Sequence, residues 1–338
     1  MLKNEISYIA QGKSLSREMT ENAFDKIMSG AVNDIQISAF LTALSIKGET
    51  IDEITAAATI LRKYCLQLPH KSEVLDIVGT GGDKSDSFNI STTSAFVLNA
   101  AGIDVAKHGN RAASSKCGAA DLIEALGAKL DISAEKSGEI LDKTGVCFLF
   151  AQKYHSAMKY VGKVRKEIGI KTIFNLVGPL SNPAFPKYQL MGVYSEELLK
   201  PLAHSLANIG VKNLMTAYGR DGLDEISLCG ETAVYEIIDG KESEYIITPE
   251  KLGFDRCSKN DLTGGSPQEN AEITLSILNG EKGHKRNAVV LNCIYAYHLV
   301  HPEMELLDIK EIIENSIDSG KALNKLNEFL KLTKEGIQ

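Results

Sequence analysis

The chain has 338 residues, of which 43% are hydrophobic and 24% are charged. These fractions are typical of a globular protein with a buried core, and the length allows one large domain or two of unequal size. The formal net charge of −7, from 37 basic and 44 acidic residues, argues against a general nucleic-acid-binding protein, which usually has a basic face. A local basic segment can still bind an anionic substrate.

The N-terminus and the cysteines indicate a cytoplasmic protein that is not bound to a membrane. The first 12 residues contain no apolar segment of the signal-peptide kind. No apolar run approaches the roughly 20 residues that a membrane-spanning helix needs. The six cysteines are scattered along the sequence, at positions 65, 117, 147, 229, 257 and 293, without a close metal-ligand pair. We therefore expect reduced and mostly buried thiols.

The first 65 or so residues predict helices. Asn33 is followed by Gln36, and Thr50 by Glu53, at the spacing of a capping box at a helix start. Apolar residues recur between polar ones, and no run of strand type interrupts them. We predict a small helical domain over 1–66.

In the larger predicted domain, over 67–338, strand, loop and helix recur. Strands are expected at 74–78, 105–106 and 146–150, and helices at 92–101 and 119–126. This alternation predicts an α/β domain with a largely parallel central sheet. Ligands in such folds bind at the carboxyl ends of the strands, where two polar loops of this chain also fall.

A helical stretch, three further strands and a late helix complete this domain. Residues 152–183 read as helical, and Gly–Pro and Asn–Pro turn signals end that stretch. The strands are expected at 188–194, 214–218 and 233–238, and the late buried helix at 291–299.

The first polar loop is rich in glycine and contains Gly79, Gly81, Gly82 and Asp83. Closely spaced glycines let backbone N–H groups approach an anion, and the helix that begins near Ser91 adds its positive N-terminal end. The glycine spacing is neither that of a dinucleotide-binding fingerprint nor that of a P-loop. A tight turn is the alternative interpretation of this loop.

The next segment, 89–92, has the sequence Asn-Ile-Ser-Thr at a helix start. Such residues are ordinary helix caps. Their hydroxyl groups could also bind phosphate oxygens or a metal ion, because they directly follow the glycine loop. Both interpretations stay open at this point.

The second polar loop, over 107–118, has the sequence KHGNRAASSKCG. It combines two lysines, an arginine, a histidine, an asparagine and two serines with two glycines, so it cannot belong to the core. Every one of these polar groups can donate a hydrogen bond, which suits a polyanion such as a pyrophosphate. We therefore predict anion binding at this loop.

Two adjacent acids, Asp224 and Glu225, lie in a further loop. Such a pair is common on protein surfaces, but Mg²⁺ usually binds through one or two carboxylates together with substrate phosphates. A phosphate site elsewhere in the chain therefore favours a metal role. His155 and Arg165 lie ten residues apart in the helical stretch, and nothing in the pattern alone distinguishes them from surface residues.

Five segments resemble the anthranilate phosphoribosyltransferase family, in its order and at its spacing. They are DIVGTGGD (76–83), FNIST (88–92), KHGNRAASSKCGAADLIEALG (107–127), VRKEIGIKTIFNLVGPLSNP (164–183) and DGLDEIS (221–227). The resemblance covers nearly the whole chain, and the long HGNR and GPLSNP blocks make it specific. It implies a nucleoside-phosphorylase-type fold, usually as a homodimer, in which helices from about 155–186 join the small domain.

The resemblance also implies the residues of a site for phosphoribosyl pyrophosphate (PRPP), anthranilate and Mg²⁺. The residues implied for PRPP are Gly79, Gly82, Asp83, Ser87, Asn89, Ile90, Ser91, Thr92, Lys107, His108, Gly109, Asn110, Arg111, Ala112, Ala113, Ser114, Ser115 and Ala119. Those implied for anthranilate are Gly79, Asn110, His155 and Arg165, with Arg165 suited to pair with the substrate carboxylate. Ser91, Asp224 and Glu225 are implied for Mg²⁺. Asn110, Arg165 and His155 are the catalytic candidates, and His155 is only a candidate for a general base.

The implied reaction is displacement of pyrophosphate from the ribose by the amine of anthranilate, in tryptophan biosynthesis. The chain departs from many family members at Lys171, Tyr218 and Ala119, none of which removes a group that this reaction needs. A pyrimidine nucleoside phosphorylase of the same fold is one alternative, and the HGNR block and the Asp224–Glu225 pair argue against it. A non-catalytic paralogue that binds nucleic acid or a phosphorylated ligand is the other alternative.

Overall fold

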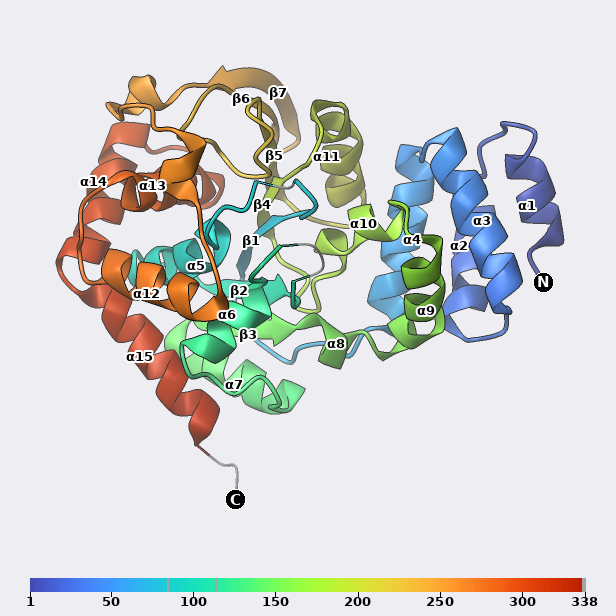
Figure 1. The fold of residues 1–338 in the computed structure, drawn as a ribbon, viewed down its shortest axis with the longest axis horizontal. Helices are drawn as coiled ribbons and strands as arrows, with labels where there is room; N and C mark the ends of the chain where they lie inside the picture. Colours follow the sequence, from blue (N-terminus) through green and yellow to red (C-terminus); the bar gives the residue numbers. More distant parts are fainter. Residues whose placement is uncertain (84, 113–114, 336–338) are drawn as a thin grey trace.

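The structure, a computed structural model, describes residues 1–83, 85–112 and 115–335. Ala113 and Ser114, which are predicted for the PRPP site, lie outside these residues. The chain begins with four helices that pack together at one end of the molecule (Figure 1). They are α1 (Lys3–Ile9), α2 (Arg17–Met28), α3 (Asp34–Lys47) and α4 (Ile51–Tyr64).

The capping signals of this helical part are realised in different ways. Thr50 and Glu53 form the predicted capping box, with Glu53 N donating to Thr50 Oγ1 at 3.3 Å and Thr50 N to Glu53 Oε2 at 2.8 Å. Asn33 also caps its helix by accepting from Gln36 N at 3.0 Å. The prediction of a complete box there is wrong, because Gln36 Oε1 accepts instead from the backbone N–H of Leu2.

A later segment returns to these helices. It consists of α8 (Ala151–Tyr154), η1 (Ser156–Met158), α9 (Lys159–Ile168), α10 (Phe174–Val177) and η2 (Pro179–Ser181). Helix α9 packs on α3 and α2, α10 packs on α4, and the rings of Phe24 and Phe174 lie 5.7 Å apart. The predicted helical stretch 152–183 is therefore real but broken, because Gly169 ends α9 in a left-handed conformation.

The remaining part of the chain contains a seven-stranded sheet. Its strands are β1 (Leu75–Gly79), β2 (Val105–Gly109), β3 (Val146–Phe150), β4 (Tyr188–Gly192), β5 (Asn213–Gly219), β6 (Thr232–Ile238) and β7 (Lys241–Ile247). The order is β3-β2-β1-β4-β5-β6-β7; the first five strands are parallel, and β6 and β7 are antiparallel. The predicted class, a small helical domain with a larger, largely parallel α/β domain, is confirmed.

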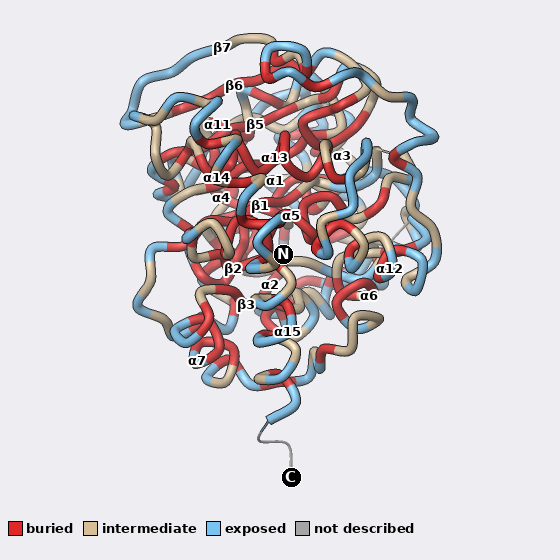
Figure 2. The backbone as a smooth tube through the Cα atoms, turned by 90° about the vertical axis from the view of Figure 1, so that its left-hand side faces the viewer, coloured by how far each residue is buried: buried red, intermediate tan, exposed pale blue. Residues whose placement is uncertain are grey.

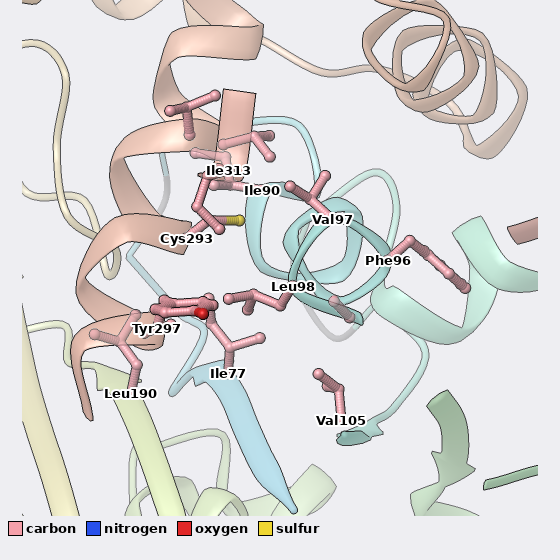
Figure 3. Packing of buried hydrophobic residues seen from close by; sticks show 14 of the residues in the cluster. Ile77, Ile90, Phe96, Val97, Leu98, Val105, Leu190, Cys293, Tyr297 and Ile313 are labelled. Carbon is pink, nitrogen blue, oxygen red and sulfur yellow. The ribbon is translucent and has the colours of Figure 1, made fainter. Parts of the chain in front are cut away.

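Helices cover one face of the sheet with the largest apolar core of the described chain. Helix α5 (Ile90–Ala100) packs on β1 and β2, and α13 (His284–Val300) packs on α5, β4 and β5. Figure 3 shows side chains of α5, such as Leu98, beside Ile77 of β1 and Cys293 and Tyr297 of α13. The late buried helix expected at 291–299 is the second half of α13.

The other face of the sheet joins the helical part of the chain. Side chains alternate along each strand, so Leu190 faces the first core and Met191 the second. Helix α11 (Leu199–Asn208) packs on β5 and β6 on this second side and also contacts α4. The remaining elements are α6 (Ala119–Ala125), α7 (Ala134–Thr144), η3 (Glu196–Leu198), η4 (Pro249–Leu252), η5 (Lys259–Leu262), α12 (Pro267–Leu278), α14 (Leu306–Asp318) and α15 (Lys321–Lys334).

Strand β7 lies at the outer edge of the sheet, and most of it is exposed (Figure 2). Among the described helices, none is long and apolar enough to cross a membrane. The six cysteines are free thiols, and four of them are buried, as expected. Cys229 and Cys257, far apart in sequence, have their sulfur atoms 3.5 Å apart.

Candidate active site

A pocket with a volume of about 710 Å³ lies at the carboxyl ends of β1 and β2. The chain continues from β1 to β2 on one side, and β4 pairs with β1 on the other side. The pocket therefore lies beside a topological switch point, where α/β sheets bind their ligands. The opposite wall comes from the returning segment, including His155, Met158, Arg165 and Phe174.

The structure brings together every described residue that the sequence predicts for the site. Those that line the pocket are Gly79, Gly82, Asp83, Ser87, Asn89, Ile90, Ser91, Thr92, Lys107, His108, Gly109, Asn110, Arg111, Ala112, Ser115, Ala119, His155, Arg165, Asp224 and Glu225. Sequence reasoning missed other lining residues, among them Met158, Phe174 and Asn175. Phe174 and Asn175 lie in a block that carries the family resemblance, which is the signal that could have identified them.

The glycine loop after β1 has a backbone that only glycine adopts easily. Gly81 and Gly82 have φ angles of 71° and 76°. The Gly81 N–H donates to Asp224 Oδ2 at 2.6 Å. A Cβ atom at Gly79 would lie 2.4 Å from the same oxygen. The loop therefore lies directly against the turn that contains Asp224 and Glu225, which we call the acidic turn.

The two adjacent acids are buried rather than exposed on the surface. Asp224 is 8% exposed and Glu225 is 7% exposed. Burial, the charges of Asp83 and Glu225 and a hydrogen bond with Asp83 raise the pKa of Asp224 well above its usual range. Burial raises the pKa of Glu225 to about 7, although Lys107 and Ser91 oppose this shift. The turn thus brings carboxyl groups together where water cannot screen their charges, so they hold their protons more tightly unless a cation binds.

This acidic turn fits a divalent cation that is shared with a substrate. Glu225 Oε2 and Asp83 Oδ2 are buried and accept no hydrogen bond from the described residues. Within the described ranges, no cluster of three or more His, Cys, Asp or Glu side chains could hold a metal ion by itself. A few carboxylates that need further oxygen ligands from phosphates are the usual Mg²⁺ arrangement. Ser91 lies beside these acids, because its backbone N–H donates to Glu225 Oε1 at 3.3 Å, and its hydroxyl oxygen accepts from Lys107 Nζ at 3.2 Å.

The start of α5 does not follow the plain capping interpretation. Asn89 occupies the N-cap position, but the described structure contains no cap bond from its side chain. Its Nδ2 donates instead to the carbonyl and sulfur of Cys117 and to Asn270 Oδ1, at 3.4, 3.3 and 3.2 Å. Ser91 and Thr92 are buried at 9% and 1% exposure. This burial is shared by most of α5, so it is the missing cap bond of Asn89 that favours the ligand-binding interpretation.

The loop after β2 holds its charges in two ways. Lys107 is buried, and its ammonium donates to the carbonyl of Ile77 at 2.5 Å as well as to Ser91. Arg111 forms ion pairs with Asp121 and Glu124 of α6, at 2.9 and 2.8 Å. The Arg111 guanidinium is therefore engaged by the protein, and Lys107 is the loop's buried positive charge beside the acidic turn.

Two buried histidines meet at the back of the pocket. The rings of His108 and His155 lie 5.1 Å apart, edge to face. Burial lowers the pKa of His108 well below its usual range and the pKa of His155 to about 4. Their Nε2 atoms have no hydrogen-bond partner among the described residues. Both rings are therefore neutral near pH 7, with a free ring nitrogen each.

Arg165 extends from α9 toward the pocket without a carboxylate partner in the described ranges. Its guanidinium lies 5.4 Å from the ring centre of Phe174. Burial alone lowers the pKa of Arg165. An arginine in this setting can bind a planar carboxylate, with an aromatic ring beside it for a flat ligand.

Comparisons with known proteins agree with this geometry. Two models of a glycosyl transferase family match the chain: the helical bundle domain over 4–65 and the a/b domain over 71–323. An anthranilate phosphoribosyltransferase of Lachnoclostridium phytofermentans is 53% identical over 98% of this chain and 99% of its own.

Solved structures of this family share the whole fold. The enzyme of Thermus thermophilus has a TM-score of 0.92 at 38% identity, over 97% of this chain and 99% of its own. The enzyme of Saccharomyces cerevisiae, in complex with PRPP and Mg, has a TM-score of 0.88 at 30% identity, over 94% and 93%. The same yeast enzyme with 4-fluoroanthranilate gives 0.86 at 28% identity, with the same coverage. The chain belongs to the anthranilate phosphoribosyltransferase family.

Proposed function

We propose that this pocket transfers the 5-phosphoribosyl group of PRPP to the amine of anthranilate and releases pyrophosphate, in tryptophan biosynthesis. One observation carries the proposal. A single pocket joins a glycine loop and a buried acidic turn on one wall with an arginine that has no carboxylate partner in the described ranges on the other. The first wall suits a phosphate ester with a metal ion, and the second suits an aromatic acid.

The sheet wall binds PRPP in this proposal. The N–H groups of the glycine loop and of the start of α5, with the Ser91 and Thr92 hydroxyls, bind phosphate oxygens. The described part of the loop after β2, 107–112 and Ser115, lies along the pyrophosphate and ribose, with Lys107 as its buried charge. Ala113 and Ser114 belong to the same predicted set. Arg111 belongs to this set as well, and its ion pairs with α6 support the loop.

Asp224, Glu225 and the Ser91 hydroxyl would hold Mg²⁺ together with PRPP. When bound there, the ion would neutralise negative charge on the departing pyrophosphate. Asp83 adds a further carboxylate at the same place. Lys107 supplies a fixed positive charge beside these acids.

The helical wall binds anthranilate. Arg165 pairs with its carboxylate, and the Phe174 ring lies beside the guanidinium, where it can contact the aromatic ring of the substrate. Asn110 and Gly79, which line the same pocket after β2 and β1, contact anthranilate from the sheet wall in this proposal, and Asn110 is its catalytic candidate there. His155 stays neutral at pH 7 because burial lowers its pKa to about 4. Because a ring with so low a pKa is a weak base, we assign it a hydrogen bond to the substrate amine rather than removal of a proton.

Positioning provides much of the rate in this scheme. The amine of anthranilate is nucleophilic without deprotonation, so the two walls need mainly to bring it against C1 of the ribose. The walls belong to the two predicted domains, 1–66 with the segment from about 155–186, and 67–338. Their approach would exclude water from the reaction.

The three departures from the family pattern fit this scheme. Lys171 Nζ lies 3.3 Å from the ring centre of Tyr194 and donates to the carbonyl of Gly82 at 3.4 Å. It therefore links the helical wall to the glycine loop and can affect substrate affinity. Ala119 lines the pocket at the start of α6 without a hydroxyl. Tyr218 lies on β5 and packs with the second core.

The direct test is loss of anthranilate fluorescence when PRPP and Mg²⁺ are added to the purified protein. Decay that stops with EDTA and releases pyrophosphate supports the proposal. A folded protein that binds PRPP without decay would contradict it. Phosphorolysis of thymidine is the parallel assay for the phosphorylase alternative, and we expect none.

We also propose that the protein is a cytoplasmic homodimer. The free thiols fit a reducing compartment. Ile35 and Ile46 on α3 are 80% and 81% exposed, and large apolar side chains of this exposure on one helix suit an interface between two copies.

A further inference from the structure

The acidic turn lies against a pair of glycines in the sheet. Gly79 ends β1 and Gly192 ends β4, and the two residues are partners in the parallel register. A Cβ atom at Gly192 would lie 1.6 Å from the carbonyl oxygen of Asp224 and 3.0 Å from Glu225 N. Contacts this short do not occur in folded proteins, so any side chain at Gly192 would displace the turn. Gly192 has no positive φ, so this restriction is steric rather than conformational.

Ile226, the residue after Glu225, is held by hydrogen bonds from helix α13 on the side of the turn away from Gly192. Asn292 of α13 is fully buried, and its Oδ1 accepts from the backbone N–H of Ile226 at 3.0 Å. Its Nδ2 donates to the Ile226 carbonyl at 2.9 Å and to the Ala288 carbonyl at 2.9 Å. The amide thus satisfies both backbone groups of the residue that directly follows Glu225. Only an amide side chain of this length offers a donor and an acceptor in this arrangement.

We propose that Gly192 and Asn292 are positioning residues for the metal-binding acids Asp224 and Glu225. Gly192 leaves the space into which the turn fits, and Asn292 fixes its backbone at Ile226. Neither residue is among the described residues that line the pocket. The inference rests on the proposed function for the metal role of the two acids, but the placement of the turn can be tested without activity.

Two residues offer matched controls. Asn213 of β5 is also buried, at 2% exposure, and bonds to two backbone groups, the Leu299 carbonyl at 2.8 Å and the Asp239 N–H at 3.0 Å. It does not contribute to the described lining of the pocket. Gly230 follows the acidic turn in sequence, has no positive φ, and a Cβ atom there would meet nothing within 4 Å.

The first experiment measures backbone protection in the metal-free protein. Hydrogen exchange of a peptide containing Ile226 is compared in wild type, Asn292→Ala and Asn213→Ala. We expect faster exchange of the Ile226 amide only in Asn292→Ala, because only that change removes its acceptor. Similar protection of this amide in all three proteins would overturn the proposal.

The second experiment measures metal affinity in the presence of PRPP and without anthranilate, by electron paramagnetic resonance of Mn²⁺. Residues that orient metal ligands typically change affinity by about 10- to 100-fold when they are mutated. We expect a loss of this size in Asn292→Ala and in Gly192→Ala, and wild-type affinity in Asn213→Ala and Gly230→Ala. Equal Mn²⁺ affinity in all folded variants would overturn the proposal.

Gly192→Ala acts from the opposite side of the turn, so it tests the proposal if Asn292→Ala does not fold. The transfer activity of the wild type, measured in the same preparations, distinguishes a failure of the proposed function from a failure of the proposed role of Gly192 and Asn292. A wild type that lacks Mg²⁺-dependent transfer contradicts the proposed function, whereas the exchange result judges the placement of the turn alone.

Discussion

Arg165 is the residue on which recognition of the acceptor depends. It faces the pocket beside Phe174, and none of the described carboxylates pairs with it. A hydrogen bond to a charged group contributes about 1.5–3 kcal/mol, which corresponds to roughly a 10- to 100-fold change in binding. We therefore expect Arg165→Ala to raise the KM for anthranilate by about that factor and to leave the KM for PRPP nearly unchanged.

Steady-state kinetics with each substrate varied in turn checks this prediction. Lys163 is the control, because it lies on the same helix with its side chain 71% exposed. Lys163→Ala should leave both KM values as in wild type. Equal increases of the two KM values in Arg165→Ala would show that the arginine supports the pocket as a whole instead of binding the substrate carboxylate.

Asp76 gives the folded chain a pH-dependent stability. It is completely buried in β1, and burial raises its pKa from 3.8 to about 6, although Lys107 and hydrogen bonds oppose the shift. The folded state thus binds this proton more tightly than the unfolded state. The stabilisation is complete below about pH 4 and is lost as the pH rises through 6, by about 3 kcal/mol.

Urea unfolding at a series of pH values measures this effect. We expect the free energy of unfolding of wild type to fall between about pH 4 and pH 6 relative to that of Asp76→Asn, which cannot lose a proton. A difference between the two proteins that stays constant over this range would contradict the assignment to Asp76.

Single residues also mark how far the sequence could predict the site. The polar loops after two strands were visible because glycines and donors cluster there, and the family resemblance supplied His155 and Arg165. Gly192 and Asn292 were not predictable, because each is an isolated residue in an apolar segment whose partner lies more than 30 residues away. The engagement of Arg111 with α6 is likewise a tertiary contact that spacing does not reveal.

Among the elements, α12 holds the start of α5 in place. Asn270 of α12 is buried, and its Oδ1 accepts from both the backbone N–H and the side-chain Nδ2 of Asn89, at 3.1 and 3.2 Å. Its own Nδ2 donates to the carbonyls of Gly265 and Ser266. We expect Asn270→Ala to weaken PRPP binding by about tenfold, because two hydrogen bonds that orient Asn89 are lost.

Isothermal titration with PRPP tests this connection in the absence of anthranilate. Asn279 caps the carboxyl end of the same helix, and among the described residues its side chain bonds only to the Leu275 carbonyl. Asn279→Ala should therefore bind PRPP like wild type. Unchanged PRPP affinity in Asn270→Ala would show that α5 is ordered without the help of α12.

The elements differ in how well the sequence predicts them. The apolar runs at 146–150 and 233–238 have strand patterns that burial on a sheet explains, and the structure has strands there. β7 escaped prediction because its sequence, KESEYII, starts with four exposed polar residues and has no alternating apolar face. An edge strand of this kind is defined by its hydrogen bonds to β6 and by its charges, which discourage pairing with other chains.

For the whole molecule, the alternation of strand and helix was enough to predict a helical domain with a largely parallel α/β domain. It was not enough to show that the segment over 151–181 crosses back to the helices at the N-terminus. That return depends on contacts such as the one between the Phe24 and Phe174 rings. The pocket exists because of this return, since Arg165 and Met158 reach it only from the far wall.

The exposed face of α3 predicts the state of the molecule in solution. Ile35 and Ile46 are 11 residues apart, which is about three helical turns, so they lie on one stripe of the helix. Burying an isoleucine contributes about 1.5–3 kcal/mol, and in a symmetric dimer each change is present twice. We expect the double variant Ile35→Asp, Ile46→Asp to be a folded monomer, because four carboxylates would have to enter the interface.

Light scattering coupled to size-exclusion chromatography measures the mass in solution, and circular dichroism checks the fold. Leu307 is the control, because it is also well exposed, at 59%, and belongs to α14, a helix at the opposite end of the molecule from α3 (Figure 1). Leu307→Asp should keep the dimer mass. A double variant that keeps the dimer mass would move the interface away from α3, and a monomeric wild type would contradict the homodimer itself.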